Sequence, residues 1–265
     1  MATPNRWSVR EAAEATFYKL DGNKDAIVTL RTLKTSGVET SGTTTYSRGG
    51  KGNAKLIGFS SDRESKVTLQ DAIFDNLALA ALTGNAITTG AKTVDQIYEV
   101  DVPATPFQIT VPNKIKSVTS VFILDADGVT PKTLYTVNAS AVAGSKYAIS
   151  GQVLTFTDTE AGDKVRVYYK SDTDATAKSV KVTSDKFGGT FRLVLDCLIR
   201  DEYTKTDYAG QLVVFNAKIE DNFKFEMSAT GDPSVLDIPI EVLKDPSSTN
   251  MWELVIYDES LIPAS

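Results

Sequence analysis

The chain has 265 residues, of which 42% are hydrophobic and 23% charged, and it carries a formal net charge of −6. This composition is ordinary for a soluble globular protein of about one or two domains, and the acidic balance argues against a surface that grips nucleic acid, because phosphate binding needs a basic stripe. The absence of histidine removes the commonest general base and the commonest metal ligand. The single cysteine, Cys197, cannot form a disulfide within the chain.

The first elements along the chain are strands. Apolar and polar residues alternate over 15–20 and 26–33, around the turn sequence DGN, which predicts a β-hairpin. The segment 34–54 is rich in glycine, serine and threonine and has no helical pattern, so it is interpreted as a long loop. Loops beyond about 12–15 residues are uncommon unless they bind something or are disordered. Strand patterns resume over 54–60 and 65–69.

One helix is predicted, from Thr68 to Gly84. Thr68 is a suitable N-cap, Asp71 falls in the first turn where a carboxylate suits the helix dipole, and Gly84 ends the pattern. The second half, LALAAL, is apolar nearly all round, which indicates burial on two sides. Two interpretations remain open: the helix lies between the core and loops of one subunit, or it forms a subunit interface.

The character of the sequence changes at about residue 96. The segment VPATPFQITVP contains three prolines and marks a boundary, and short alternating strands with turns then continue to about residue 172. This pattern predicts a small all-β sandwich inserted at 96–177. Longer strands are predicted after it, over 178–184, 190–201, 210–229, 236–243 and 251–259. The simplest organisation is therefore one discontinuous β-rich domain of residues 1–95 and 178–265 that carries this insertion.

Charge differs along the chain. Residues 1–95 contain 12 basic and 10 acidic residues, residues 96–172 contain 7 and 8, and residues 173–265 contain 9 and 16. A slightly basic first third and an acidic last third are compatible with head-to-tail association of copies. Ordinary solubility charge is the simpler interpretation of this asymmetry taken alone.

Motifs that resemble catalytic or metal sites are incomplete. SRGGKGNAK has Gly52 where a phosphate loop needs a hydroxyl, and DGNKDAIVTLRT has Ala26 and Thr32 where a calcium loop needs Gly and Glu. Adjacent acids such as Asp201 and Glu202 would point to opposite faces of a strand. The sequence therefore predicts no enzyme, no catalytic or metal site and no cofactor.

Two stretches resemble a known family. IGFSSDRESKVTLQDAIFDNLALAALTG and FKFEMSATGDPSVLDIPIEVL with MWELVIYDE are similar to parts of bacteriophage tail tube proteins, the major tail proteins, which share their plan with type VI secretion and pyocin tubes. The resemblance covers roughly residues 10–95 and 178–259. It implies a mainly β fold, a β-sandwich or barrel with one flanking α-helix, and an immunoglobulin-like insertion. It also implies a structural role in which six copies form a ring, rings stack, and DNA passes through the lumen.

The resemblance also implies roles for particular segments. The long strands after Lys178 would line the lumen with acidic residues facing inward. The segment 34–54 would be an extended hairpin arm that reaches a neighbouring ring and becomes ordered on assembly. The arm residues are Ser36, Gly37, Gly42, Tyr46, Arg48, Gly49, Gly50 and Lys51. The helix residues that would contact an adjacent subunit are Leu69, Ile73, Phe74, Leu77, Leu79 and Leu82.

The partners implied are further copies of the chain, other tail proteins (tape measure, terminator and distal tail protein) and DNA that passes without specific binding. No membrane partner is expected, because no apolar run approaches the roughly 18 residues of a span, and the opening residues lack the apolar region of a signal peptide. The expected location is the phage tail, after assembly in the host bacterial cytoplasm. The alternatives are a head or head-decoration protein, or an extracellular β-sandwich binding module.

The C-terminal stretch yields two further expectations. Alternation in FKFEM predicts a strand with Phe223, Phe225 and Met227 on one face. Pro239 within LDIPI predicts an edge strand, because proline leaves one ladder donor missing.

Overall fold

The computed structural model divides into two compact units, one built from both ends of the chain and the other from its middle. Each unit has its own sheet and core, and each is described by itself. The units comprise Met1–Ile87 with Val180–Ser265, and Thr88–Ser179. The structure describes residues 3–11, 13–21, 25–141, 144–157, 160–224 and 233–261.

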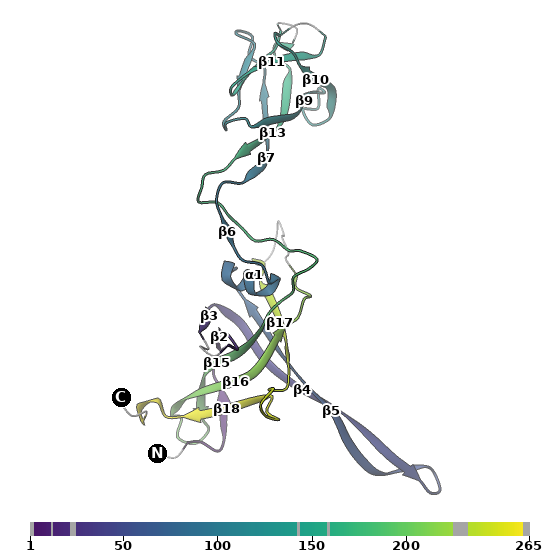
Figure 1. The fold of residues 1–265 in the computed structure, drawn as a ribbon, viewed down its shortest axis with the longest axis vertical. Helices are drawn as coiled ribbons and strands as arrows, with labels where there is room; N and C mark the ends of the chain where they lie inside the picture. Colours follow the sequence, from purple (N-terminus) through teal and green to yellow (C-terminus); the bar gives the residue numbers. More distant parts are fainter. Residues whose placement is uncertain are drawn as a thin grey trace. The chain divides into compact units, whose positions relative to one another are not determined.

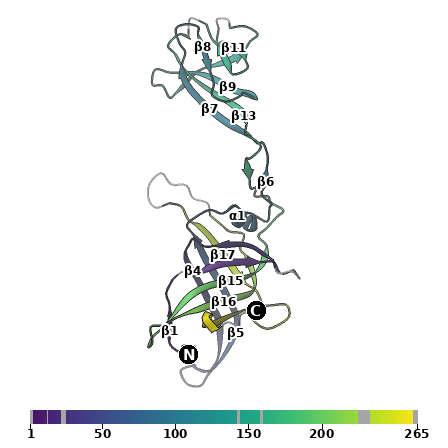
Figure 2. The same cartoon turned by 90° about the vertical axis from the view of Figure 1, so that its left-hand side faces the viewer.

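The described strands of the first unit form one nine-stranded antiparallel sheet (Figure 1). Its order is β3-β2-β15-β16-β17-β5-β4, with β1 also paired to β15 and β18 also paired to β16. The sheet curls into a nearly closed barrel-like form (Figure 2). The strands are β1 Trp7–Val9, β2 Glu14–Tyr18, β3 Ala26–Leu30, β4 Leu33–Gly49, β5 Ala54–Asp71, β15 Thr190–Asp201, β16 Asp207–Ile219, β17 Leu236–Val242 and β18 Trp252–Tyr257.

Alternation along the strands directs one face of this sheet into the core. Leu193 of β15 lies directly between Phe17 of β2 and Val214 of β16, and all three side chains are buried. Ile238 of β17 and Leu69 of β5 extend the same core. Fully burying an apolar side chain of this size stabilises the fold by roughly 1.5–3 kcal/mol, so the curled sheet is held together mainly by its inner face.

The predicted hairpin near the N-terminus is confirmed, since β2 and β3 pair antiparallel. The middle of its predicted turn, residues 22–24, lies outside the described residues. The strands predicted over 190–201, 236–243 and 251–259 correspond to β15, β17 and β18.

The predicted helix boundaries are wrong. The helix α1 is Asn76–Thr83, and residues 68–71 continue β5 instead. Asp75 is the N-cap, because its carboxylate accepts hydrogen bonds from the amides of Leu77 (2.6 Å) and Ala78 (3.2 Å). The segment KVTLQD pairs with β17, and this pairing outweighs its local tendency to start a helix. The predicted N-cap, Thr68, therefore lies seven residues before the actual N-cap, Asp75.

The end of α1 is as predicted, at Gly84. Its φ of +65° is favourable for glycine, and a Cβ added there would lie 2.2 Å from the carbonyl oxygen of Phe187. Ala78 and Leu82 of α1 are buried in the core of the first unit, next to the curled sheet (Figure 1).

The predicted loop at 34–54 is also wrong as a secondary-structure assignment. This segment forms most of β4 and the turn that leads into β5, and the two strands pair from Leu33 opposite Asp71 to Gly49 opposite Ala54. Threonine-rich sequence suits a strand, and the cross-strand ladder supplies backbone partners that composition alone does not reveal.

The prediction that Pro239 lies in an edge strand is wrong. β17 pairs with β5 along its whole length and with β16 over its last residues. The carbonyl of Pro239 accepts a hydrogen bond from the amide of Glu220 (2.9 Å), so the side of the proline without a donor faces the position just past the end of β16 at Ile219. Proline therefore removes only the reciprocal bond to the carbonyl of Glu220, at the end of the β16–β17 ladder.

The expected FKFEM strand is only partly within the described residues. Phe223 and Lys224 follow the end of β16 outside any strand, and residues 225–227 lie outside the described residues, as do Gly231 and Asp232 of the GDPS turn. The strand expected at 178–184 is limited to β14, Lys178–Ser179.

The second unit contains a seven-stranded sheet in the order β7-β13-β9-β10-β11-β12-β8, antiparallel except for the β10–β11 pair. Its sheet starts at Thr93, before the expected boundary at 96. A separate two-stranded ladder joins β6 to β14. The strands are β6 Thr88–Thr89, β7 Thr93–Asp101, β8 Gln108–Thr110, β9 Ser117–Leu124, β10 Pro131–Val137, β11 Lys146–Ser150, β12 Val153–Thr155 and β13 Lys164–Asp172.

Within its described residues, the second core contains a buried polar contact. The hydroxyl of Tyr135 donates to the carboxylate of Glu160 (2.9 Å), and burial together with this carboxylate raises the pKa of Tyr135. The aromatic rings of Tyr135 and Phe156 meet edge-on at 6.0 Å. This unit therefore has an independent packed interior.

The revised helix start generates a stability prediction. We expect Asp75→Ala to lower the free energy of unfolding by about 1 kcal/mol, because it removes the N-cap acceptor. Thr68→Ala is the matched control, since Thr68 is an exposed strand residue. Denaturant unfolding measures both; an equal or larger effect of Thr68→Ala would contradict the helix boundary described here.

Candidate assembly surfaces

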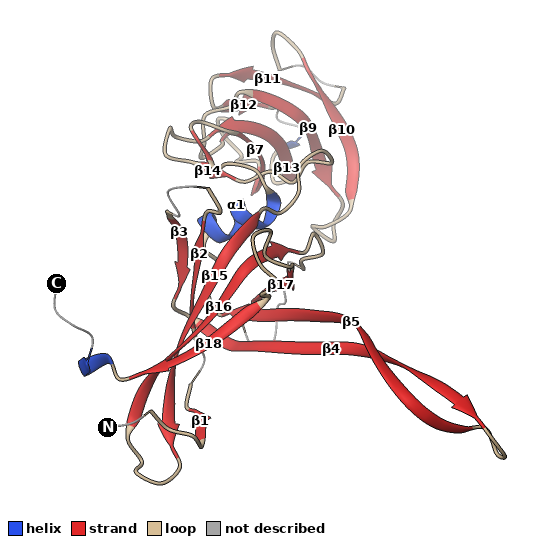
Figure 3. Cartoon of the chain, turned by 60° about the horizontal axis from the view of Figure 1, so that its bottom comes forward, coloured by secondary structure: helices blue, strands red, loops and turns tan. Residues whose placement is uncertain are grey.

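The hairpin of β4 and β5 is the most prominent candidate assembly surface (Figure 3). β17 supports β5 only over Ser65–Asp71. Beyond this, residues 41–48 of β4 and 54–64 of β5 are exposed on both faces. A two-stranded ribbon is only marginally stable alone in water. We call residues 41–64 the distal arm.

The end of the distal arm combines apolar and basic side chains. Leu56, Ile57 and Phe59 are 64%, 57% and 59% exposed, and Tyr46 is also exposed. The segment 44–59 contains three basic residues and no acidic residue; the basic residues are Arg48, Lys51 and Lys55. Exposed apolar groups of this size in one segment indicate an interaction surface, and the charge favours an acidic partner surface.

On one face of the arm, the Tyr46 ring packs over a glycine and a lysine. Tyr46 lies opposite Gly58, and a Cβ added to Gly58 would come within 3.2 Å of the Tyr46 ring. The Nζ of Lys55 lies 3.9 Å from the centre of the same ring. The ring thus covers a glycine that would otherwise weaken the strand.

The distal arm has a local irregularity at its base. The register shifts between Ser41 and Thr43, and Asp62 on the facing strand has a φ of +51°. A bulge of this kind bends a hairpin and increases its twist. Here it sets the direction in which the distal arm leaves the sheet.

The structure separates the predicted arm residues into two groups. Ser36 and Gly37 lie in the part of β4 that pairs within the body of the sheet, and the Ser36 hydroxyl accepts a hydrogen bond from the amide of Ala13 (3.0 Å). The distal arm and its turn contain the others: Gly42, Tyr46, Arg48, Gly49, Gly50 and Lys51. The sequence interpretation missed Leu56, Ile57 and Phe59, although it assigned them to a strand.

The six predicted helix residues do not form one helix face. Leu69 lies in β5 with no exposed surface, and Ile73 and Phe74 precede α1. Leu82 is buried in the core, whereas Leu77 is 49% exposed. The remaining residue, Leu79, packs partly against the core. Burial of Ala78 and Leu82 indicates that α1 closes the interior of its own subunit.

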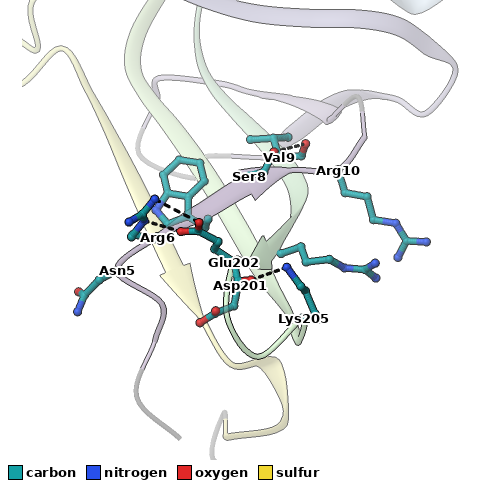
Figure 4. A pocket seen from close by; sticks show the side chains of 10 residues that line it. Asn5, Arg6, Ser8, Val9, Arg10, Asp201, Glu202 and Lys205 are labelled. Carbon is teal, nitrogen blue, oxygen red and sulfur yellow. Dashed lines mark hydrogen bonds and ion pairs between the residues drawn. The ribbon is translucent and has the colours of Figure 1, made fainter.

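The strand β1 borders a surface depression (Figure 4). Its lining runs along residues 5–10 and continues onto Arg200, Asp201, Glu202 and Lys205. Arg6 forms an ion pair with Glu202, and its guanidinium also lies 5.7 Å from the Tyr203 ring centre. These contacts hold the strand to the β15–β16 turn.

An Arg–Asp–Arg cluster lies at the same end of the sheet. Asp207 accepts hydrogen bonds from Arg200 (2.6 Å, twice) and Arg10 (3.1 Å). These guanidinium contacts lower the pKa of Asp207, with Arg200 as the main cause. The cluster fixes the chain just after β1 against β15 and β16.

The face of the sheet away from the core carries acidic residues. Asp196 of β15 lies directly between Glu14 of β2 and Gln211 of β16, and Glu253 of β18 lies on the same face by register. Like charges directly opposite one another are unfavourable in a sheet. Only Glu14 has a described ion pair among these acids, with Arg31 (3.4 Å). We call Glu14, Asp196 and Glu253 the acidic face.

Other site types find little support in the described part of the chain. No group of three or more Cys, Asp or Glu residues there is arranged to hold a metal ion. Within the same residues, no helix has the length and apolar character needed to cross a membrane.

Exposed strand edges and a projecting hairpin with exposed apolar side chains are features typical of structural proteins that associate with other protein chains. The chain belongs to the YomU/Tube protein family, whose model matches residues 7–255. The family name indicates a tube-like structural protein of phage. A search of curated proteins gave no match.

The exposure of the arm generates a proteolysis prediction. Lys51 lies in the turn between β4 and β5, where all neighbouring side chains are exposed. We expect trypsin to cut the unassembled protein first after Lys51, because loop tips are preferred sites of nicking. Lys51→Gln should slow this first cut, as measured by mass spectrometry of early fragments. First cleavage within β15 or β16 would contradict the description of the arm.

Proposed function

We propose that this chain is the tail tube subunit of a bacteriophage, and that six copies form a ring whose stacking produces a tube for DNA. The observation that carries the proposal is the distal arm. It extends beyond the sheet of its own subunit and exposes Leu56, Ile57 and Phe59 where this subunit offers them no cover. Contact with a neighbouring ring would bury these side chains and support the arm backbone.

The acidic face gives the tube a suitable lining. Glu14, Asp196 and Glu253 lie on the face of the sheet opposite to the core. If this face surrounds the lumen, its carboxylates repel the phosphate backbone, so DNA slides without being held. Glu14 pairs with Arg31 and Asp196 accepts a hydrogen bond from Gln211 (2.8 Å), so both carboxylates are held in place on this face.

The second unit has a different role in this proposal. Thr88 and Ser179 pair in the β6–β14 ladder, so the chain enters and leaves the unit at adjacent positions. A unit attached in this way, with its own core, can be added to a subunit without disturbing its sheet. We assign it to the outer surface of the tube.

Electron microscopy of the purified protein tests the main proposal. At raised protein concentration we expect rings with six-fold symmetry and tubes of stacked rings. Monomers at every concentration, also in high salt and with crowding agents, would contradict it. A closed shell or a single layer on a preformed capsid would instead favour a head or head-decoration protein.

Shortening the arm tests its role in stacking. Thr43 pairs with Ser61, so replacing residues 44–60 with Asn-Gly closes a shorter hairpin of the same register. We expect this variant to remain folded by circular dichroism and to form no tubes, because the apolar contact between rings is lost. Tubes of normal length would show that the arm does not join rings.

Removing the second unit tests its placement. Replacing residues 90–177 with Asn-Gly would leave β6 and β14 as a short hairpin. We expect tubes of unchanged subunit repeat and smaller outer diameter in electron micrographs. Loss of assembly in a variant that keeps the thermal unfolding of the first unit would contradict the outer placement.

A further inference from the structure

The second unit carries an open depression on the solvent side of its seven-stranded sheet. The depression has a volume of about 400 Å³ and crosses strands β7, β13 and β9. Its lining includes two aromatic side chains, Phe122 and Tyr168, and the exposed Ile97. Pockets of roughly 300–1,000 Å³ with mostly apolar walls and a few polar groups are the usual form of a small-molecule site. The proposed tube assembly makes no use of this depression.

Strand register shows that these side chains lie on the face of the sheet away from the core. Val167 and Tyr169 of β13 are buried in the core, so Tyr168 between them points to the opposite face by alternation. Tyr168 lies opposite Ile97 of β7 and Ser120 of β9. Ile97 is 62% exposed. The solvent side of the sheet therefore presents an apolar and an aromatic side chain next to each other, where polar side chains are usual.

The ring of Tyr168 is fixed by its neighbours. Phe122 meets it edge-on, with 6.2 Å between the ring centres and 88° between the ring planes. Hydrogen bonds to Glu99 and, second, to Tyr168 raise the pKa of the Arg166 guanidinium, which therefore holds the hydroxyl end of the ring. Leu134 lies opposite Phe122 and is 53% exposed, so the apolar surface continues onto β10. A fixed aromatic ring offers its face to a ligand at little cost in side-chain entropy.

A β-bulge brings two hydroxyl groups to the same depression. The register of β9 against β13 shifts between Tyr168 and Tyr169, and Thr119 is the extra residue of β9 at this point. Ser120 lies opposite Tyr168, and it lines the depression together with Thr119. Bulges are over-represented next to functional sites, where they re-aim a side chain. The irregularity thus places two successive hydrogen-bonding groups beside an aromatic ring.

The charged groups around the depression neutralise one another. Asp95, which lines it, forms an ion pair with Lys170 (2.6 Å), and Glu99 forms one with Arg166 (2.5 Å). Lys170 and Arg166 are each two residues from Tyr168 along β13, so both ion pairs lie on its face of the sheet. This face therefore offers hydrogen-bond donors and acceptors with little net charge, which favours a neutral polar ligand over an anion or a cation.

We propose that this depression binds a neutral saccharide, with one pyranose ring stacked on Tyr168. One face of a pyranose ring presents C–H groups, which pack on the negatively polarised face of an aromatic ring. The hydroxyl groups of the sugar both donate and accept hydrogen bonds, as do those of Thr119 and Ser120. Asp95 supplies a further acceptor at the rim. This inference goes beyond the proposed function and does not depend on assembly of the tube.

The size of the apolar patch argues against a protein partner. A standard protein–protein interface buries roughly 800 Å² on each partner. Ile97 and Leu134 of the patch are more than half exposed, whereas Phe122 and Tyr168 are only partly exposed. These four side chains together expose much less than the area that such an interface needs. A single sugar ring matches the face of one aromatic side chain and is the better fit.

Substitutions at the depression test the proposal in the full-length chain. Thr119→Arg fills the depression with a large side chain from an exposed bulge position, so it should leave the fold intact. Tyr168→Phe keeps the ring, whereas Tyr168→Leu removes the stacking surface. Val129→Ala, in the turn between β9 and β10 and 64% exposed, is the matched control. Circular dichroism and thermal unfolding check that each variant is folded.

Saturation-transfer difference NMR gives the readout, because it detects the sugar and works with single chains and assemblies alike. The probes are the methyl glycosides of glucose, galactose, mannose and N-acetylglucosamine at millimolar concentrations. We expect at least one probe to receive saturation, strongest at the C–H protons of one ring face. The same probe should not bind Thr119→Arg, and Tyr168→Leu should weaken its binding by roughly two- to tenfold. Tyr168→Phe and Val129→Ala should bind it like the unmodified chain.

Three results would each overturn the inference. Saturation of none of the methyl glycosides would show that the depression takes no pyranose ring. Equal binding by Thr119→Arg and by the unmodified chain would place the sugar elsewhere on the protein. Self-association that is lost in Thr119→Arg, without saturation of any sugar, would assign this face to a second copy of the chain.

The saccharide site and the proposed function can fail separately. The depression is formed within the second unit alone, so failure of the chain to form rings would contradict the proposed function and leave the saccharide site unaffected. Well-formed tubes that bind none of the methyl glycosides would contradict the saccharide site alone.

Discussion

The rest of the structure depends on the need of backbone amides and carbonyls in a sheet for hydrogen-bond partners. The core buries the side chains on the inner face of the nine-stranded sheet. Neighbouring strands provide hydrogen-bond partners for most of its backbone groups. The distal arm has strand edges and apolar side chains without cover in its own subunit. β1 and β18 add two further edges. Natural proteins usually protect such edges, and association with further copies would satisfy all of them at once.

The strands that could be predicted from the sequence are those with strong periodicity and clear limits. β15, β17 and β18 lie where alternation of apolar residues ends at turn sequences. The three-residue strand β1 has no such pattern and was missed, although its register on β15 creates a free edge. The helix start was misplaced because cross-strand pairing at Thr68 and Leu69 outweighs local propensity.

The distal arm could likewise be predicted only in part from the sequence. Its composition indicated an unusual segment, and the turn between β4 and β5 at Gly50 and Lys51 falls within it. Composition could not show that 34–49 pairs with β5, because a ladder depends on a facing strand. Tyr46 and Arg48 were predicted as arm residues from the sequence. Ile57 and Phe59 could be recognised only from the structure, which shows that β17 does not extend beside them.

The central proposal is that neighbouring copies complete the sheet of this chain. Hydrogen–deuterium exchange, followed residue by residue in monomers and in assembled material, tests it most directly. The account predicts fast exchange of the Trp7, Val9, Leu254 and Ile256 amides in the monomer and strong protection on assembly. Amides of Leu193 and Val214, inside the sheet, should be protected in both states. Unchanged fast exchange at both edges in well-formed tubes would contradict the account.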